Sequence, residues 1–98
     1  MDRTNTVNGT WFDADEAEVI EGLTEYNGSN YISIHVGANR AQNIYITKSG
    51  AYVLQHTSRY SKEPTWYEEL DKEEAMEWLL TNKNYDKIDK KYLQEKQI

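Results

Sequence analysis

The residues best suited to chemistry in this sequence are two histidines, His35 and His56. Two imidazoles begin a zinc site, but zinc needs three or four converging ligands and no His-x-His, Glu-x-x-His or His-Glu-x-x-His spacing occurs. We therefore expect ordinary surface or rim histidines. A small hydrolase stays open as a less favoured alternative, and it requires the histidines to meet carboxylates in space.

A second candidate for chemistry is the acidic cluster Asp13, Asp15, Glu16 and Glu18. Clustered carboxylates suit Ca²⁺, but an EF-hand loop needs Gly at its sixth position and Glu at its twelfth, where this chain has Glu18 and Thr24. Acidic side chains also favour a helix N-terminus through the helix dipole. The cluster therefore predicts a solvated helix start and no metal site.

Other catalytic signatures are missing from the 98 residues. The chain has no Cys, which excludes disulfides, thiolate catalysis and iron–sulfur clusters. It also has neither a Gly-x-Gly-x-x-Gly nor a Walker A motif for phosphate. We expect no enzyme, with no catalytic, cofactor-binding or metal-binding residues.

The charge is unevenly distributed along the chain. Residues 1–82 carry a net charge of −8 and residues 83–98 a net charge of +2. An acidic body repels nucleic acid and membrane surfaces and attracts basic proteins. Two stretches, 13–25 with six carboxylates and 63–77 with seven, are acidic enough to imitate an array of phosphates. They are equally well explained as solvated helix faces.

The elements that must position these residues follow from periodicity. A polar, flexible lead-in over 1–10 precedes a short helix over 14–21. The helix starts with a capping-box pattern at Asp13 and Glu16 and stops at Gly22. Alternation from Tyr31 to Val36 predicts a half-buried strand, followed by a loop over 37–42. Leu23–Tyr26 supplies an edge strand before the Asn27-Gly28 turn signal.

The clearest strands form a hairpin over 44–56, turning at Lys48-Ser49-Gly50, with a further short strand over 65–70. Asp71 and Glu74 form a capping box for a helix over 72–81, which Asn82 ends in a left-handed conformation. Its apolar stripe places Trp78 under the sheet, against isoleucines of the strands. Residues 83–98 are a basic tail, either docked as a helix or frayed.

These elements predict one α+β domain over 11–82, in which a small antiparallel sheet of three to five strands packs on the helix 72–81. Aromatic side chains cluster around the hairpin and the loop after it, where they either stabilise the sheet or form an exposed interface patch. The candidate protein-binding residues combine them with carboxylates of the second acidic stretch: Tyr31, Tyr45, Tyr60, Trp66, Tyr67, Glu63, Glu68, Glu69, Glu73 and Glu77.

Several segments together resemble a set of small uncharacterised bacterial proteins: Trp11-Phe12, Asn30 to Ser33, Tyr45 to Leu54, Tyr67-Glu68 and Glu73 to Leu80. After the hairpin those proteins have a Gln-Trp-Gln-Gly-like segment, where this chain reads Ser58-Arg59-Tyr60-Ser61. The resemblance implies one compact unit over residues 11–82 and supplies no mechanism.

The sequence therefore favours a cytoplasmic, non-catalytic protein that binds a basic, nucleic-acid-handling partner, as an inhibitor or antitoxin from a phage or plasmid would. We expect no direct nucleic-acid or membrane binding. A self-associating accessory domain, with a homodimer built on an exposed strand face, is the alternative.

Overall fold

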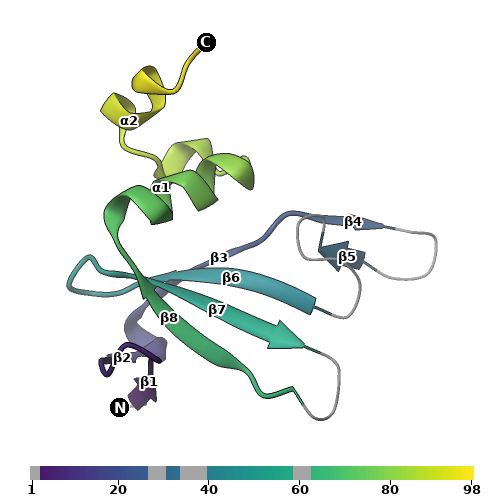
Figure 1. The fold of residues 1–98 in the computed structure, drawn as a ribbon, viewed down its shortest axis with the longest axis vertical. Coiled ribbons are helices and arrows are strands. Elements are labelled where there is room, and N and C mark those ends of the chain that lie inside the picture. Colours follow the sequence, from purple (N-terminus) through teal and green to yellow (C-terminus); the bar gives the residue numbers. More distant parts are fainter. Residues whose placement is uncertain (1–2, 27–30, 34–39, 59–62) are drawn as a thin grey trace.

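The structure is a computed structural model that describes residues 3–26, 31–33, 40–58 and 63–98. Its main sheet has the strand order β3-β6-β7-β8, with all neighbours antiparallel (Figure 1). The four strands are β3 (Glu18–Glu21), β6 (Arg40–Ile46), β7 (Tyr52–Ser58) and β8 (Trp66–Leu70). The expected α+β architecture with a small antiparallel sheet is confirmed.

The β6–β7 hairpin forms as predicted and is longer than expected. Gly50 has φ +88°, which suits a glycine, and the Thr47 backbone N–H donates to the Ala51 carbonyl across the turn. At the other end Arg40 pairs with Ser58, so the loop expected over 37–42 is wrong for residues 40–42. The strand continues there because its residues find partners on β7.

The helix predicted over 14–21 is wrong. Only a 3-10 turn forms, over Ala14–Glu16, and β3 follows it. The Asp13 side chain accepts from the Asp15 N–H and closes a tight turn in place of a capping box. Val19 and Ile20 are β-branched, which favours a strand, and Ile20 pairs with the fully buried Ile44.

The flexible lead-in also differs from the prediction, because residues 3–10 form one strand and the loop of a hairpin. β1 (Arg3–Asn5) pairs with β2 (Trp11–Asp13) around a loop in which the Thr6 and Thr10 hydroxyls lie 2.6 Å apart. This loop closes the outer edge of β8. The Val7 N–H donates to the Tyr67 carbonyl at 2.8 Å, and the Glu69 N–H donates to Asn8 Oδ1 at 2.7 Å.

A second small hairpin matches the prediction. β4 (Thr24–Tyr26) pairs with β5 (Tyr31–Ser33), on either side of the Asn-Gly turn signal. The expected continuation of the second strand to Val36 lies outside the described residues, as does His35.

The helix α1 (Lys72–Thr81) has the predicted bounds, and both hydrogen bonds of the predicted capping box are present. Its buried face consists of Ala75, Met76 and Leu79, which pack with Ile20 and Ile44 of the sheet. Trp78 is only partly buried and lies at the margin of this core. The sequence pattern therefore overestimated the burial of Trp78, because α1 is rotated so that Met76 faces the core instead.

Asn82 ends α1 in a different way from the one predicted. Its φ is −93°, and the left-handed residue is Lys83, with φ +60°. Asn82 is buried, where its Oδ1 accepts from the Leu23 N–H at 2.8 Å and its Nδ2 donates to the Trp78 carbonyl at 2.9 Å. The side chain therefore joins the helix end to the segment between β3 and β4.

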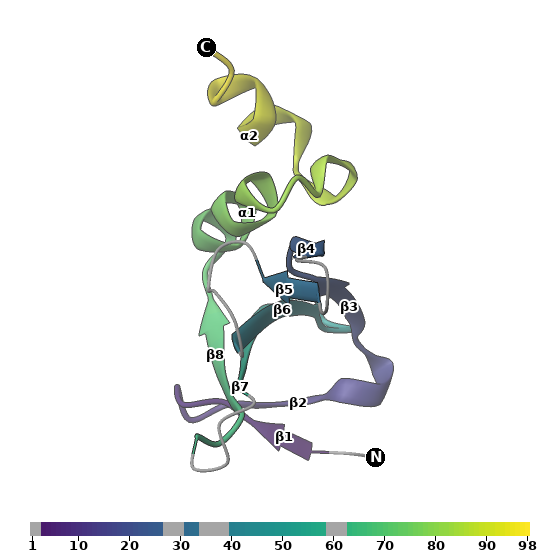
Figure 2. The ribbon, with the colours of Figure 1, turned by 90° about the vertical axis from the view of Figure 1, so that its right-hand side faces the viewer.

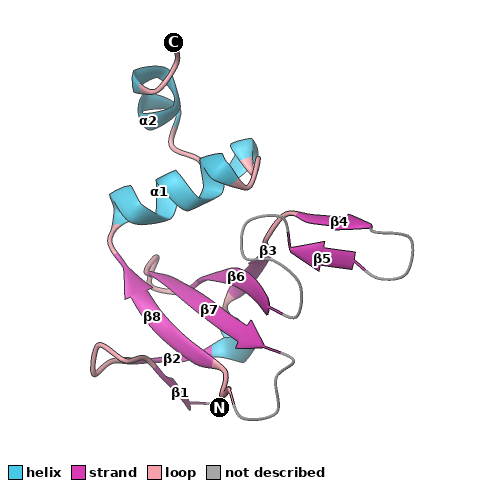
Figure 3. Ribbon diagram, turned by 45° about the vertical axis from the view of Figure 1, so that its right-hand side comes forward, coloured by secondary structure: helices cyan, strands magenta, loops and turns pink. Residues whose placement is uncertain are grey.

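The basic tail is docked through Ile88, which is buried in the core cluster. Ile88 lies between a 3-10 turn, Tyr85–Lys87, and the short helix α2 (Lys90–Glu95). Two surface ion pairs accompany it, Lys87 with Glu18 at 2.8 Å and Asp89 with Lys72 at 3.0 Å. Figure 3 shows the helices at one end of the molecule and the β1–β2 hairpin at the other. Within the described ranges, neither helix has the length and apolar character needed to cross a bilayer.

Acid should weaken this docking. The hydrogen bond from Lys72, helped by the Lys91 N–H, lowers the pKa of Asp89 below its ordinary value of 3.8. A carboxylate with a lowered folded pKa stabilises the fold above its unfolded pKa and loses that contribution as the pH falls through the folded value. We expect the urea concentration at the unfolding midpoint to fall as the pH is lowered below 3.8. In Asp89→Asn, which lacks this carboxylate, the midpoint should fall less. An identical acid profile for the variant would contradict this.

Candidate protein-binding site

His56 lies at the centre of a group of side chains on the face of β7 and β8 that α1 also covers, here called the helix face. Its ring stacks on Trp66, its cross-strand partner, with centroids 3.8 Å apart and an interplanar angle of 8°. Its Nε2 lies 3.0 Å from Glu68 Oε1. Trp66 stacks on His56 through one face and still exposes 41 % of its surface.

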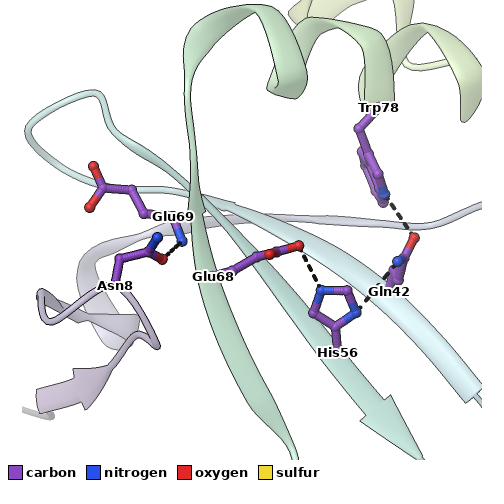
Figure 4. A network of polar contacts seen from close by, with 6 residues as sticks. All are labelled: Asn8, Gln42, His56, Glu68, Glu69 and Trp78. Atoms are coloured by element: carbon purple, nitrogen blue, oxygen red, sulfur yellow. Dashed lines mark hydrogen bonds and ion pairs between the residues drawn. The ribbon is translucent and has the colours of Figure 1, made fainter.

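A chain of hydrogen bonds connects this stack to α1 (Figure 4). Trp78 Nε1 can only donate, so it fixes Gln42 with its Oε1 toward the indole at 3.2 Å. The Gln42 amide nitrogen then faces His56 Nδ1 at 3.5 Å, a long contact in which Nδ1 accepts. The tautomer that fits both neighbours has its N–H on Nε2, where it faces Glu68 Oε1.

A pocket of about 430 Å³ opens beside the stack, and Arg40 and Glu63 lie on its rim. The Arg40 guanidinium holds the Glu63 carboxylate through two hydrogen bonds, at 2.8 and 3.3 Å. These bonds, with a further one from Ser58, lower the pKa of Glu63 below its ordinary value. The pocket thus combines an exposed aromatic ring with fixed charges of both signs.

Three of the ten expected binding residues meet here: Glu63, Trp66 and Glu68. The sequence missed the parts played by His56, Gln42 and Arg40. The signal for His56 and Trp66 was the strand register, since antiparallel pairing of β7 with β8 sets them opposite each other. The sequence alone does not fix this register, because it also depends on the length and turn type of the loop between the two strands.

Tyr45 and Tyr67 lie on the opposite face, under the β1–β2 hairpin. Together with the buried Phe12 they form an aromatic cluster with centroid distances of 5.3 to 6.2 Å. Burial, and to a smaller degree the neighbouring Tyr67, raises the pKa of Tyr45. The exposed patch expected at Tyr45 is therefore wrong, and its ring serves to pack the hairpin onto the sheet.

The other candidates are spread over the molecule. Glu69 is exposed on the face of the sheet that the β1–β2 hairpin covers, and its carboxylate accepts from the Thr10 hydroxyl at 2.9 Å. Glu73 and Glu77 are exposed on α1. The side chain of Tyr31 and all of Tyr60 lie outside the described part of the chain.

Among the described residues, no three His, Asp or Glu side chains come close enough to hold a metal ion. The hydrolase alternative required an imidazole beside a carboxylate, and His56 has one in Glu68. The other imidazole, His35, is not described. Comparison of the chain with protein-family models, curated proteins and solved structures gives no match.

Proposed function

We propose that this chain is a non-catalytic protein-binding domain whose acidic surface engages a basic, nucleic-acid-handling protein, in the manner of an inhibitor that imitates phosphates. The observation that carries the proposal is the state of the carboxylates between β8 and the end of α1. All five carboxylates between residues 69 and 77 are exposed, and no basic side chain of the described ranges forms an ion pair with any of them.

The charges in this segment are also arranged unfavourably for the isolated chain. Lys72, its single base, points its ammonium group to Asp89 of the tail. Glu73 and Glu77 stand one helical turn apart, a like-charge spacing that costs about 0.2 to 0.5 kcal/mol in a helix. Asp71 and Glu74 have a structural role in the capping box, whereas Glu73 and Glu77 make no described hydrogen bond. A basic partner would relieve their repulsion.

The test is charge reversal with a matched control. Glu73→Lys/Glu77→Lys should slow association with the basic partner by about tenfold or more, because clustered charges act mainly on the association rate. Asp15→Lys/Asp86→Lys changes the net charge equally at two other exposed sites and should have a much smaller effect. The partner is first captured on the wild-type chain at low salt and identified by mass spectrometry, and rates are then measured with the purified protein.

Association of the wild-type chain should also weaken steeply as the salt rises from about 0.01 to 0.15 M, where the screening length falls from about 30 to 8 Å. Binding that is insensitive to salt, or equal losses in the two double variants, would show that the acidic segment is only a solvated surface.

A further inference from the structure

The two edge strands of the main sheet differ in whether their outward backbone groups are hydrogen bonded. Figure 2 shows β8 at one side of the sheet and β3 at the other. The loop of the β1–β2 hairpin covers β8 with two hydrogen bonds, to Tyr67 and Glu69. No described residue does the same for β3. An edge strand with unpaired backbone groups is a template for another strand.

The register shows which groups of β3 are unpaired. The Gly22 N–H donates to the Gln42 carbonyl at 3.0 Å, and the pairing continues through Ile20 with Ile44 and Glu18 with Ile46. Because hydrogen-bonded pairs alternate along an antiparallel ladder, the N–H and C=O of the intervening residues point away from β6. Those residues are Val19 and Glu21, and neither has a backbone partner among the described residues.

The side chains of β3 indicate which residues a strand bound at this edge would carry. Val19 is 47 % exposed, and Glu21 is exposed two residues along on the same face. An added antiparallel strand would place one residue opposite Val19 and another, two positions away, opposite Glu21. An apolar residue fits the first position and Lys or Arg fits the second. A second copy of the chain fits less well, since two chains of net charge −6 repel each other.

We propose that β3 binds an extended basic segment of the partner as a fifth antiparallel strand, with Val19 and Glu21 supplying the main-chain hydrogen bonds. The inference rests on the proposed basic partner and adds where and how a part of it docks. Glu18, at the start of the strand, is already paired with Lys87 at 2.8 Å, so Glu21 carries the charge selectivity.

The test uses a synthetic peptide, acetyl-Lys-Thr-Val-Lys-Thr-amide, with Val opposite Val19 and the first Lys opposite Glu21. At saturating peptide and low salt, amide exchange of Val19 and Glu21 should slow by about tenfold, because their N–H groups become hydrogen bonded. The Ile20 amide, already turned toward β6, should change much less and serves as an internal control. The matched acidic peptide acetyl-Glu-Thr-Val-Glu-Thr-amide should have no effect.

A backbone variant completes the test. Val19→Pro removes an N–H that points outward, a position at which edge strands tolerate proline, and it should abolish the effect of the peptide. Unchanged exchange protection of β6 and β7 shows that the variant is folded. If the variant does not fold, the comparison of the basic and acidic peptides on the wild-type chain still tests whether β3 binds a basic strand.

Equal exchange rates with and without the basic peptide would overturn the edge proposal. So would Val19 and Glu21 amides that are already protected, with a dimer in sedimentation equilibrium, since the occupant would then be a second copy. Neither result bears on Glu73 and Glu77. The charge-reversal experiment on α1 therefore judges the proposed function separately.

Discussion

Leu79→Ala should destabilise the fold by about 2 to 5 kcal/mol, the usual cost of truncating a buried leucine. Leu79 is fully buried, and it packs from α1 against the core cluster that includes Ile20, Ile44 and Ile88. The cavity would therefore open where the sheet, the helix and the docked tail meet. Domains of this size are stable by roughly 5 to 15 kcal/mol in total, so the loss is a large fraction.

The comparison with Trp78→Ala makes this prediction specific. From the helical stripe alone, Trp78 would be the anchor of the core and its truncation would cost about 3 to 5 kcal/mol. The structure places it at the core margin, where its indole N–H donates to Gln42. We expect Trp78→Ala to shift the urea midpoint less than Leu79→Ala, and Thr81→Ala, on the exposed face, to leave it nearly unchanged. A larger shift for Trp78→Ala would contradict the observed orientation of α1.

The parts of the fold that the sequence predicts well depend on local signals. The capping box at Asp71 and Glu74 and the Gly50 turn each lie within a few residues, and both form as expected. The prediction for residues 14–21 was wrong because the local signals of that segment compete. Asp13 and Glu16 favour a helix start, while Val19 and Ile20 favour a strand, and the contact of Ile20 with Ile44 decides the outcome.

The candidate site was predicted only in part for the same reason. Composition identified Glu63, Trp66 and Glu68, since aromatic and acidic residues are concentrated in that stretch. The geometry around them depends on non-local partners. Arg40 and Gln42 come from β6, and Trp78 comes from α1, so no spacing in the sequence indicates their contacts with the stretch or with His56.

The N-terminal hairpin shows how a polar segment can be ordered without an apolar stripe. Thr6 is buried, and its hydroxyl contacts Thr10, while the neighbouring Asn8 side chain bonds the edge of β8. Polar residues that satisfy backbone groups elsewhere look like a loop in the sequence. The difference between the covered β8 edge and the open β3 edge therefore became visible only in the structure.

Gly22→Ala should destabilise the fold by about 1 to 3 kcal/mol, the usual range for forcing extra atoms into a packed site. A Cβ on Gly22 would lie 2.5 Å from the Gln42 carbonyl oxygen, the same atom that accepts the Gly22 N–H. The obstacle is backbone of β6, which cannot move without disturbing its pairing with β7. The glycine is thus required by close approach, where the sequence had suggested a helix stop.

Gly50 provides the contrast that tests this reason. A Cβ there meets nothing within 4 Å, but φ is +88°, so the cost of Gly50→Ala comes from backbone conformation alone. Asn tolerates positive φ better than Ala does, so Gly50→Asn should be less destabilising than Gly50→Ala. At Gly22 the order should reverse, because the larger Asn side chain adds to the overlap. Urea midpoints of the four variants measure both orders, and a Gly22→Asn variant more stable than Gly22→Ala would show that steric overlap with β6 is not the cause.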